Sequence, residues 1–169
     1  MRNKRMLFLI LALVAVCLAI WRLWPRTLED VLRLSDLESA SVTADSTEVM
    51  IENNSLKIES YRLDIPAREG ERFVELLKST SYRSDFRNLL PWDVSPVHGK
   101  NISGVVAIGL DVGNEHWVVL SLSEKTMTVT VHEGDVQQEE AMALVYHPAN
   151  RALLSEIKSY VRENGTKLE

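Results

Sequence analysis

Three hydrophobic patterns follow one another along the chain and predict its elements. Residues 6–21, MLFLILALVAVCLAIW, form an unbroken apolar run behind a basic start. Beyond the run, apolar and polar residues alternate in short stretches that are bounded by turn residues, as in half-buried strands. The alternation predicts strands at 39–44, on both sides of Asn53-Asn54 within 48–65, three times across 104–132, and at 142–147.

Apolar residues at helical spacing predict helices before, between and after the strands. A short helix begins after Thr27, an N-cap residue, and extends to about Leu34. Pro66 occupies the first turn of a second helix, and a third covers 148–164 before Gly165. The predicted fold is an N-terminal transmembrane helix followed by one antiparallel-sheet domain of order β-β-β-α-β-β-β-β-α, which is an α+β domain.

The N-terminal run has the layout of an export signal, because basic residues precede an apolar stretch and are expected to stay in the cytoplasm. Its sixteen residues rise about 24 Å as a helix, less than the roughly 30 Å hydrocarbon core, but Leu23 and Trp24 extend the run. We therefore expect residues 6–24 to form a retained signal-anchor. The protein would be a single-pass protein of the cell membrane, with its N-terminus cytoplasmic and its C-terminal domain outside. The alternative is secretion after cleavage near Ala19.

The distribution of charge supports a division of the chain at this point. Five basic residues and no acid lie in the first 26 residues, which leaves 14 basic and 24 acidic residues for the remainder. An acidic surface repels phosphate backbones and argues against nucleic acid as a partner. The expected parts are a signal-anchor or transmembrane segment (1–26), a juxtamembrane helix or linker (27–36), an extracytoplasmic α+β domain (37–165) and a tail (166–169).

Cysteine content limits the chemistry of the outer domain. Cys17 is the only cysteine, so that domain has no disulfide, thiol nucleophile or thiolate metal site. Lipidation of Cys17 is disfavoured because the branched Val16 stands where a small residue is needed.

A hairpin at Gly113-Asn114 assigns residues to the two faces of the sheet. A two-residue loop there would pair residues whose numbers sum to 227, which places Val105, Ala107 and Gly109 on the core face. The opposite face would then carry Ile108, Leu110 and Trp117 as an exposed apolar patch that contacts a partner. Alternatively, other elements of the fold cover both faces, and a bulge would undo the assignment.

The same register places Asp111 opposite His116. This is a weak candidate for an acid/base or metal pair, and a cross-strand polar pair without function is the favoured explanation.

An irregular segment, 79–103, is a second candidate binding region because loops of this length often bind ligands or partners. Its aromatic and guanidinium groups could hold a carboxylate, a sugar ring or a protein. The alternative is that the aromatic residues fold onto the core while the arginines pair with nearby acids. The candidate residues are Tyr82, Arg83, Phe86, Arg87 and Trp92.

Known catalytic patterns are absent from the sequence. It contains no G-x-S-x-G, H-E-x-x-H or P-loop motif, so we predict no catalytic residue, no metal site and no cofactor. The acidic loop 133–140 could hold calcium, but it lacks the alternating acids of a dedicated calcium loop and also fits a solvated loop.

The order of elements resembles that of a group of bacterial proteins. KIESYRLDI leads into EGERFVELLKS, the hairpin VVAIGLDVGNEHWVVLSL follows, and ALVYHPANRALLSEIKSYV closes the domain. In this respect residues 37–163 resemble small, uncharacterised membrane-anchored or lipoprotein extracytoplasmic domains of Gram-positive bacteria. The resemblance implies an outward-facing, non-enzymatic domain and supplies no catalytic residues.

These observations together predict a non-enzymatic, membrane-anchored extracytoplasmic module for binding or regulation, with a membrane or envelope protein as partner. Two alternatives are a metal-dependent hydrolase of the cell envelope and a secreted sensor of a small ligand.

Overall fold

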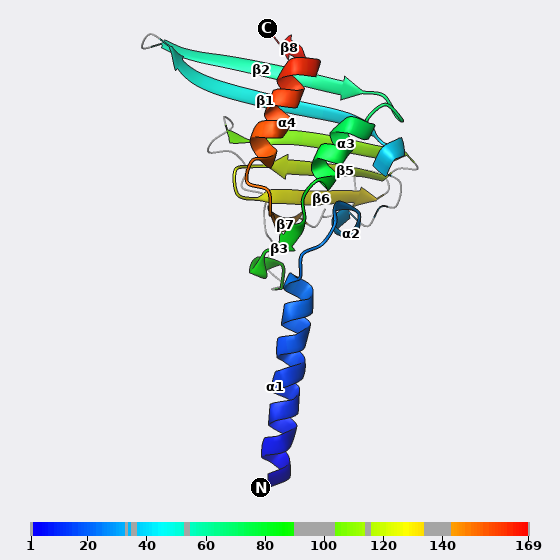
Figure 1. Cartoon of the computed structure of the whole chain (residues 1–169), viewed down its shortest axis with the longest axis vertical. Helices are drawn as coiled ribbons and strands as arrows, with labels where there is room; N and C mark the ends of the chain where they lie inside the picture. Colours follow the sequence, from blue (N-terminus) through cyan, green and yellow to red (C-terminus); the bar gives the residue numbers. More distant parts are fainter. Residues whose placement is uncertain are drawn as a thin grey trace.

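A single antiparallel sheet forms the body of the protein (Figure 1). The computed structural model describes residues 2–32, 34, 37–52, 55–89, 104–113, 116–133 and 143–168. Within them, eight strands pair in the order β3-β7-β6-β5-β4-β1-β2-β8. The strands are β1 (Ser41–Glu52), β2 (Ser55–Ile65), β3 (Tyr82–Ser84), β4 (Val106–Gly113), β5 (His116–Leu122), β6 (Met127–Glu133), β7 (Ala143–Pro148) and β8 (Thr166–Leu168).

Helices lie against one face of the sheet, and an N-terminal helix extends away from it (Figure 1). Thr27 begins the first short helix of the domain as expected: its hydroxyl accepts the Asp30 amide at 3.2 Å, and the Asp30 carboxylate accepts the Thr27 amide at 3.3 Å. The described helices are α1 (Arg2–Leu23), α2 (Leu28–Leu32), α3 (Glu71–Lys78) and α4 (Leu153–Asn164), with short 3-10 turns η1 (Leu37–Ser39) and η2 (Phe86–Leu89).

The hydrophobic core lies between α3, α4 and one face of the sheet. Both helices cross this face (Figure 1), and the ring of Phe73 on α3 meets that of Tyr160 on α4 edge-on at 5.6 Å. The sheet contributes alternate residues of its central strands, as period-two geometry requires. The fully buried sheet residues at the centre of this core are Val42, Ala44, Val106, Ile108, Leu110, Val118, Leu120, Leu122, Met127 and Val129.

The observed register differs by one residue from the predicted one. Ile108 pairs with Leu120 and Leu110 with Val118, so paired numbers sum to 228 instead of 227. The shift arises from a β-bulge between Asp111 and Gly113, where Gly113 has φ of +82° and pairs with His116. Glycine adopts this left-handed conformation without steric cost. Because side chains alternate with period two, the shift moves Ile108 and Leu110 into the core.

The predicted α+β class is confirmed, but the predicted order of elements is wrong. The strand predicted at 39–44 begins at Ser41 and is continuous with the strand predicted from 48, so both form one long strand, β1, in which the carboxylate of Asp45 pairs with Arg62 of β2. Two short strands were not predicted: β3 lies in the segment expected to be irregular, and β8 lies at the chain end. Both depend on pairing with strands far away in sequence.

The predicted transmembrane anchor is also wrong. No helix among the described residues is long and apolar enough to cross a membrane. The uninterrupted apolar run of α1 rises only about 24 Å, and basic residues follow it and precede it within the same helix. This finding overturns the signal-anchor, the single-pass cell-membrane location with an outside domain, and the membrane contact through residues 6–24. Cleavage near Ala19 stays a prediction.

Candidate binding site on the open sheet face

The face of the sheet opposite α3 and α4, here called the open face, carries a row of chemically distinctive residues. Pairing across four neighbouring strands places Ser41, Asp111, Trp117 and His132 side by side. They come from β1, β4, β5 and β6, which are separated by up to 91 residues of sequence but are adjacent in the sheet. The register therefore assembles a continuous polar and aromatic surface.

Trp117 is held in place by an aromatic stack on one side. Its ring lies 3.8 Å from that of His132 between centroids, and the two planes differ by only 4°. Such stacking fixes the orientation of the indole, because two flat rings on adjacent strands restrict each other's rotamers. Since His132 lies on the β6 side, the second face of the indole is turned towards β4.

A shallow hollow of about 560 Å³ lies beside this second face of the indole. Gly109 forms part of its lining, and a Cβ at this position would come no nearer than 3.9 Å to any atom of the surroundings compared. The missing side chain therefore leaves space that the packing does not fill. The described lining residues are Ser41, Thr43, Gly109, Leu110, Asp111, Gly113 and Trp117.

Asp111 gives the hollow a negative charge. One carboxylate oxygen accepts the backbone N–H of Gly113 at 2.8 Å, which fixes the side chain at the bulge. Within the described part of the chain this carboxylate forms no ion pair, whereas Asp45 on the same face is paired with Arg62 at 2.8 Å. Asp64, exposed on β2 opposite Thr43, lies on the same face and, together with the hydrogen-bonded Asp45, raises the pKa of Arg62. The hollow itself combines an aromatic surface with the carboxylate of Asp111, which pairs with no described cation.

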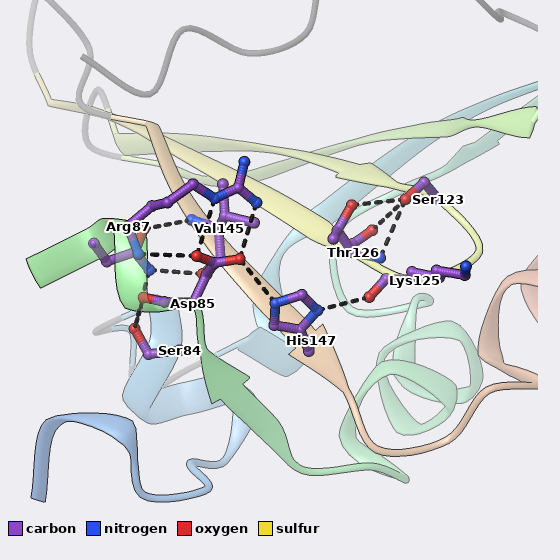
Figure 2. A network of polar contacts seen from close by, with 9 residues as sticks. Ser84, Asp85, Arg87, Ser123, Lys125, Thr126, Val145 and His147 are labelled. Atoms are coloured by element: carbon purple, nitrogen blue, oxygen red, sulfur yellow. Dashed lines mark hydrogen bonds and ion pairs between the residues drawn. The ribbon is translucent and has the colours of Figure 1, made fainter. Parts of the chain in front are cut away.

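A second polar cluster lies near the β7 end of the sheet (Figure 2). The buried carboxylate of Asp85 accepts hydrogen bonds from the Arg87 guanidinium at 2.9 and 3.0 Å and lies 2.9 Å from Nε2 of His147. The hydrogen bonds from Arg87 and the contact with His147 hold the pKa of Asp85 well below its usual range. The carboxylate therefore stays ionised although it is buried.

The ring of His147 bridges two acceptors. Its Nδ1 lies 3.0 Å from the carbonyl oxygen of Lys125, opposite the contact with Asp85 (Figure 2). Both acceptors lack a proton to donate, so only the doubly protonated ring donates to both. Through these contacts the cluster joins η2 to β7 and the β5–β6 turn.

Asn88 extends the sheet at the same edge. Its amide nitrogen donates to the carbonyl of Val145 at 2.6 Å, and its amide oxygen accepts the N–H of Val145 at 3.0 Å. The side chain thereby replaces a strand where β3 has ended, which satisfies backbone groups that an edge would otherwise expose.

The structure separates the candidates from the 79–103 segment. Tyr82 is fully buried, and its hydroxyl donates to the carbonyl of Leu77, while burial raises its pKa. Arg87 is engaged by Asp85, whereas Arg83 and Phe86 are exposed. Trp92 lies outside the described residues.

Arg83 and Trp117 lie too far apart in the sheet to form one site. Arg83 is on β3, three strands away from Trp117 on β5. Arg83 also lies about six residues further along the strand direction, which corresponds to roughly 20 Å.

The observed register separates the residues of the predicted apolar patch and those of the predicted polar pair. Ile108 and Leu110 are 0% and 1% exposed, so their side chains are unavailable to a partner, while Trp117 is partly exposed on the other face. Asp111 lies opposite Trp117, and His116 lies opposite Gly113. The bulge therefore removes the predicted pairing of Asp111 with His116.

Several residues of the hollow were not identified from the sequence. Ser41, Thr43 and Gly109 are common residue types without a motif, and no motif marks His132 as the neighbour of Trp117. The correct register would have aligned them with Trp117.

The described part of the chain contains no candidate metal site, because no three His, Cys, Asp or Glu side chains in it are arranged to hold an ion. Most of the predicted acidic loop 133–140 lies outside the described residues.

No family model, curated protein or solved structure matches this chain.

Proposed function

We propose that this protein is a non-enzymatic binding module that contacts a protein partner through its open sheet face, with Trp117 at the centre of the contact. The observation that carries the proposal is the indole of Trp117, held by His132 on one side and bordering the hollow on the other. Tryptophan in such a position often contributes much of the energy of an interface.

The surroundings of Trp117 support a contact surface in preference to a catalytic site. The hollow is wide and shallow, and its described lining contains one ionisable side chain, Asp111. Acid/base catalysis generally uses paired groups with differing pKa values, and a nucleophile needs an adjacent base. The carboxylate and imidazole of the other cluster, Asp85 and His147, are engaged in structural hydrogen bonds.

Photocrosslinking from the open face tests the proposal. Ala107 is exposed on this face, two residues from Gly109, and can be replaced by benzoylphenylalanine in the full chain. Irradiation of cells that make the protein should give a discrete crosslinked product, and Trp117→Ala should abolish it. The matched control is the same probe at Glu75, which is exposed on α3 on the other side of the sheet.

The outcome separates the two surfaces. A product from Ala107 that requires Trp117, in a chain whose circular dichroism spectrum is unchanged, supports the module. A product from Glu75 alone, or one from Ala107 that persists in Trp117→Ala, would overturn the proposal, since the partner would then contact another surface.

A further inference from the structure

The chemistry of the hollow indicates what the partner presents to it. Resting on the function proposed above, we infer that the hollow receives the guanidinium group of an arginine side chain of the protein partner, which stacks on Trp117 and pairs with the carboxylate of Asp111.

The aromatic half of the site is geometrically suited to a flat group. His132 occupies one face of the indole at 3.8 Å between ring centroids, so the second face is available on the side of the hollow. A planar group can lie against that face in the same way as the imidazole lies against the first. Guanidinium groups stack on tryptophan rings and are attracted by the negative potential of the ring face.

The electrostatic half of the site selects a cation. Asp111 is the one charged side chain among the described residues that line the hollow, and no described lysine or arginine pairs with it. Its attachment to the Gly113 N–H uses one oxygen at 2.8 Å, and the other oxygen has no hydrogen bond to a described residue. A positive ligand group would compensate this charge, whereas a carboxylate or phosphate would be repelled.

Arginine satisfies both requirements better than the other basic side chain. Its guanidinium is planar and weakly hydrated and carries several donors, which suits simultaneous stacking and carboxylate pairing. A lysine ammonium is compact and strongly hydrated, so it gains less from the indole face. The small hydroxyl side chains of Ser41 and Thr43 line the hollow and can accept further N–H donors.

Defined peptides test this inference on the full chain. The probes are acetyl-Gly-Arg-Gly-amide, its lysine counterpart and its citrulline counterpart, which keeps the planar shape of arginine but lacks the charge. The chain is kept dispersed with a nonionic detergent, because the apolar side chains of α1 are exposed. Binding is followed by the indole N–H signal of Trp117 in NMR spectra, assigned by its loss in Trp117→Phe.

The arginine peptide should shift this signal with an affinity at least several-fold higher than the lysine peptide, and the citrulline peptide should leave it unchanged. Asp111→Asn should weaken arginine binding about threefold to fivefold, because a charge-assisted pair on an exposed carboxylate becomes a neutral hydrogen bond. Asparagine can still accept the Gly113 N–H, so the hairpin is preserved. Glu163→Gln, an exposed acid on α4, removes the same charge elsewhere and should leave binding unaltered.

Equal shifts with arginine and citrulline, or unchanged binding in Asp111→Asn, would overturn the inference. Gly109→Val provides a second test that does not alter charge, since its side chain occupies the part of the hollow next to the indole and should weaken or abolish the shift. The peptide experiment and the crosslinking experiment test the two proposals separately. Trp117-dependent crosslinking without arginine binding would support the binding module and reject arginine as the group that enters the hollow. Arginine binding without crosslinking at Ala107 would support the arginine site and reject the proposed contact with a protein partner.

Discussion

The two faces of the sheet show how alternate residues of one strand acquire different roles. In β4, Ile108 and Leu110 are buried beneath the helices, while Gly109 and Asp111 line the hollow on the open face. In β5, Val118 and Leu120 are buried and Trp117 is partly exposed. One face therefore supplies stability through apolar burial, and the other is free to carry residues that stability does not require.

The two sides of the sheet exchange their character where the β1–β2 hairpin extends beyond β4. The side of the open face is apolar there, and the other side is charged. β4 pairs with β1 only as far as Ser46, so the outer part of the hairpin lacks this strand. There Ile58, 60% exposed, pairs with Val49 on the same side as the open face. Lys57 and Glu59 lie on the side that the helices cover elsewhere. Helix packing, and not strand alternation alone, therefore sets which side must be apolar.

The largest expected effect comes from shortening a core residue next to an open-face residue. Leu120→Ala should lower the free energy of unfolding by about 2–5 kcal/mol, because it leaves a cavity in the packed core. Val119→Ala, one residue earlier in β5 on the open face, should cost about 1 kcal/mol or less. Urea denaturation of both variants measures the difference. Equal losses would show that both faces are packed to the same extent.

An intermediate effect is expected from the cluster that fastens η2 to the sheet. Asp85→Asn should lower the free energy of unfolding by about 1–3 kcal/mol, since it weakens the charge-assisted contacts with Arg87 and His147. The lowered pKa of Asp85 means that its contribution is present at neutral pH and is lost as pH falls below about 4, the unfolded value.

Urea denaturation between pH 7 and pH 3 checks this linkage. The variant should lose less stability than the parent chain on acidification, because the substituted side chain no longer binds a proton. Parallel pH profiles for the two chains would contradict the assigned role of Asp85. Glu75→Gln, an exposed acid on α3, is the control for removal of one carboxylate.

The smallest effect is expected at the outer edge of β2. Glu59 accepts a hydrogen bond from Lys167 of β8 at 2.7 Å and from Tyr61 at 3.0 Å, and contacts with Lys167, Lys57 and Tyr61 lower its pKa to about 2. Glu59→Gln should leave overall stability nearly unchanged and accelerate amide exchange in β8. In the parent chain the same contact should weaken as pH falls from about 4 towards 2. Unchanged exchange of the β8 amides would show that backbone pairing alone holds this strand.

Much of the fold follows from local patterns in the sequence. The cap at Thr27 predicted α2, the Asn53-Asn54 turn predicted the β1–β2 hairpin, and alternation predicted β4 to β7. Helical spacing predicted the end of α4 at Asn164 but placed its beginning too early, because Pro148 belongs to β7 and the helix begins only at Leu153. It placed the beginning of α3 too early, because Pro66 initiates a turn in which Arg68 has φ of +70° and the helix begins only at Glu71. These features depend on residues that are close together in the chain.

The candidate site was determined by contacts that the sequence alone does not reveal. Trp117 and Asp111 were recognised as candidates, but their neighbours follow from a bulge of one residue and from the pairing of β1 with β4. A bulge depends on the balance between local backbone conformation and pairing with distant strands. A one-residue change then exchanges the buried and open faces, because side chains alternate with period two.

The amino-acid sequence by itself thus determined the α+β class, the main strands and helices, and the acidic character of the domain. The tertiary structure decided which face of each strand is covered, joined the two halves of β1, and brought Gly109, Asp111, Trp117 and His132 together. The physical reason is that propensity and periodicity act over a few residues. Register and the covering of a sheet are set by packing between segments that are far apart in the chain.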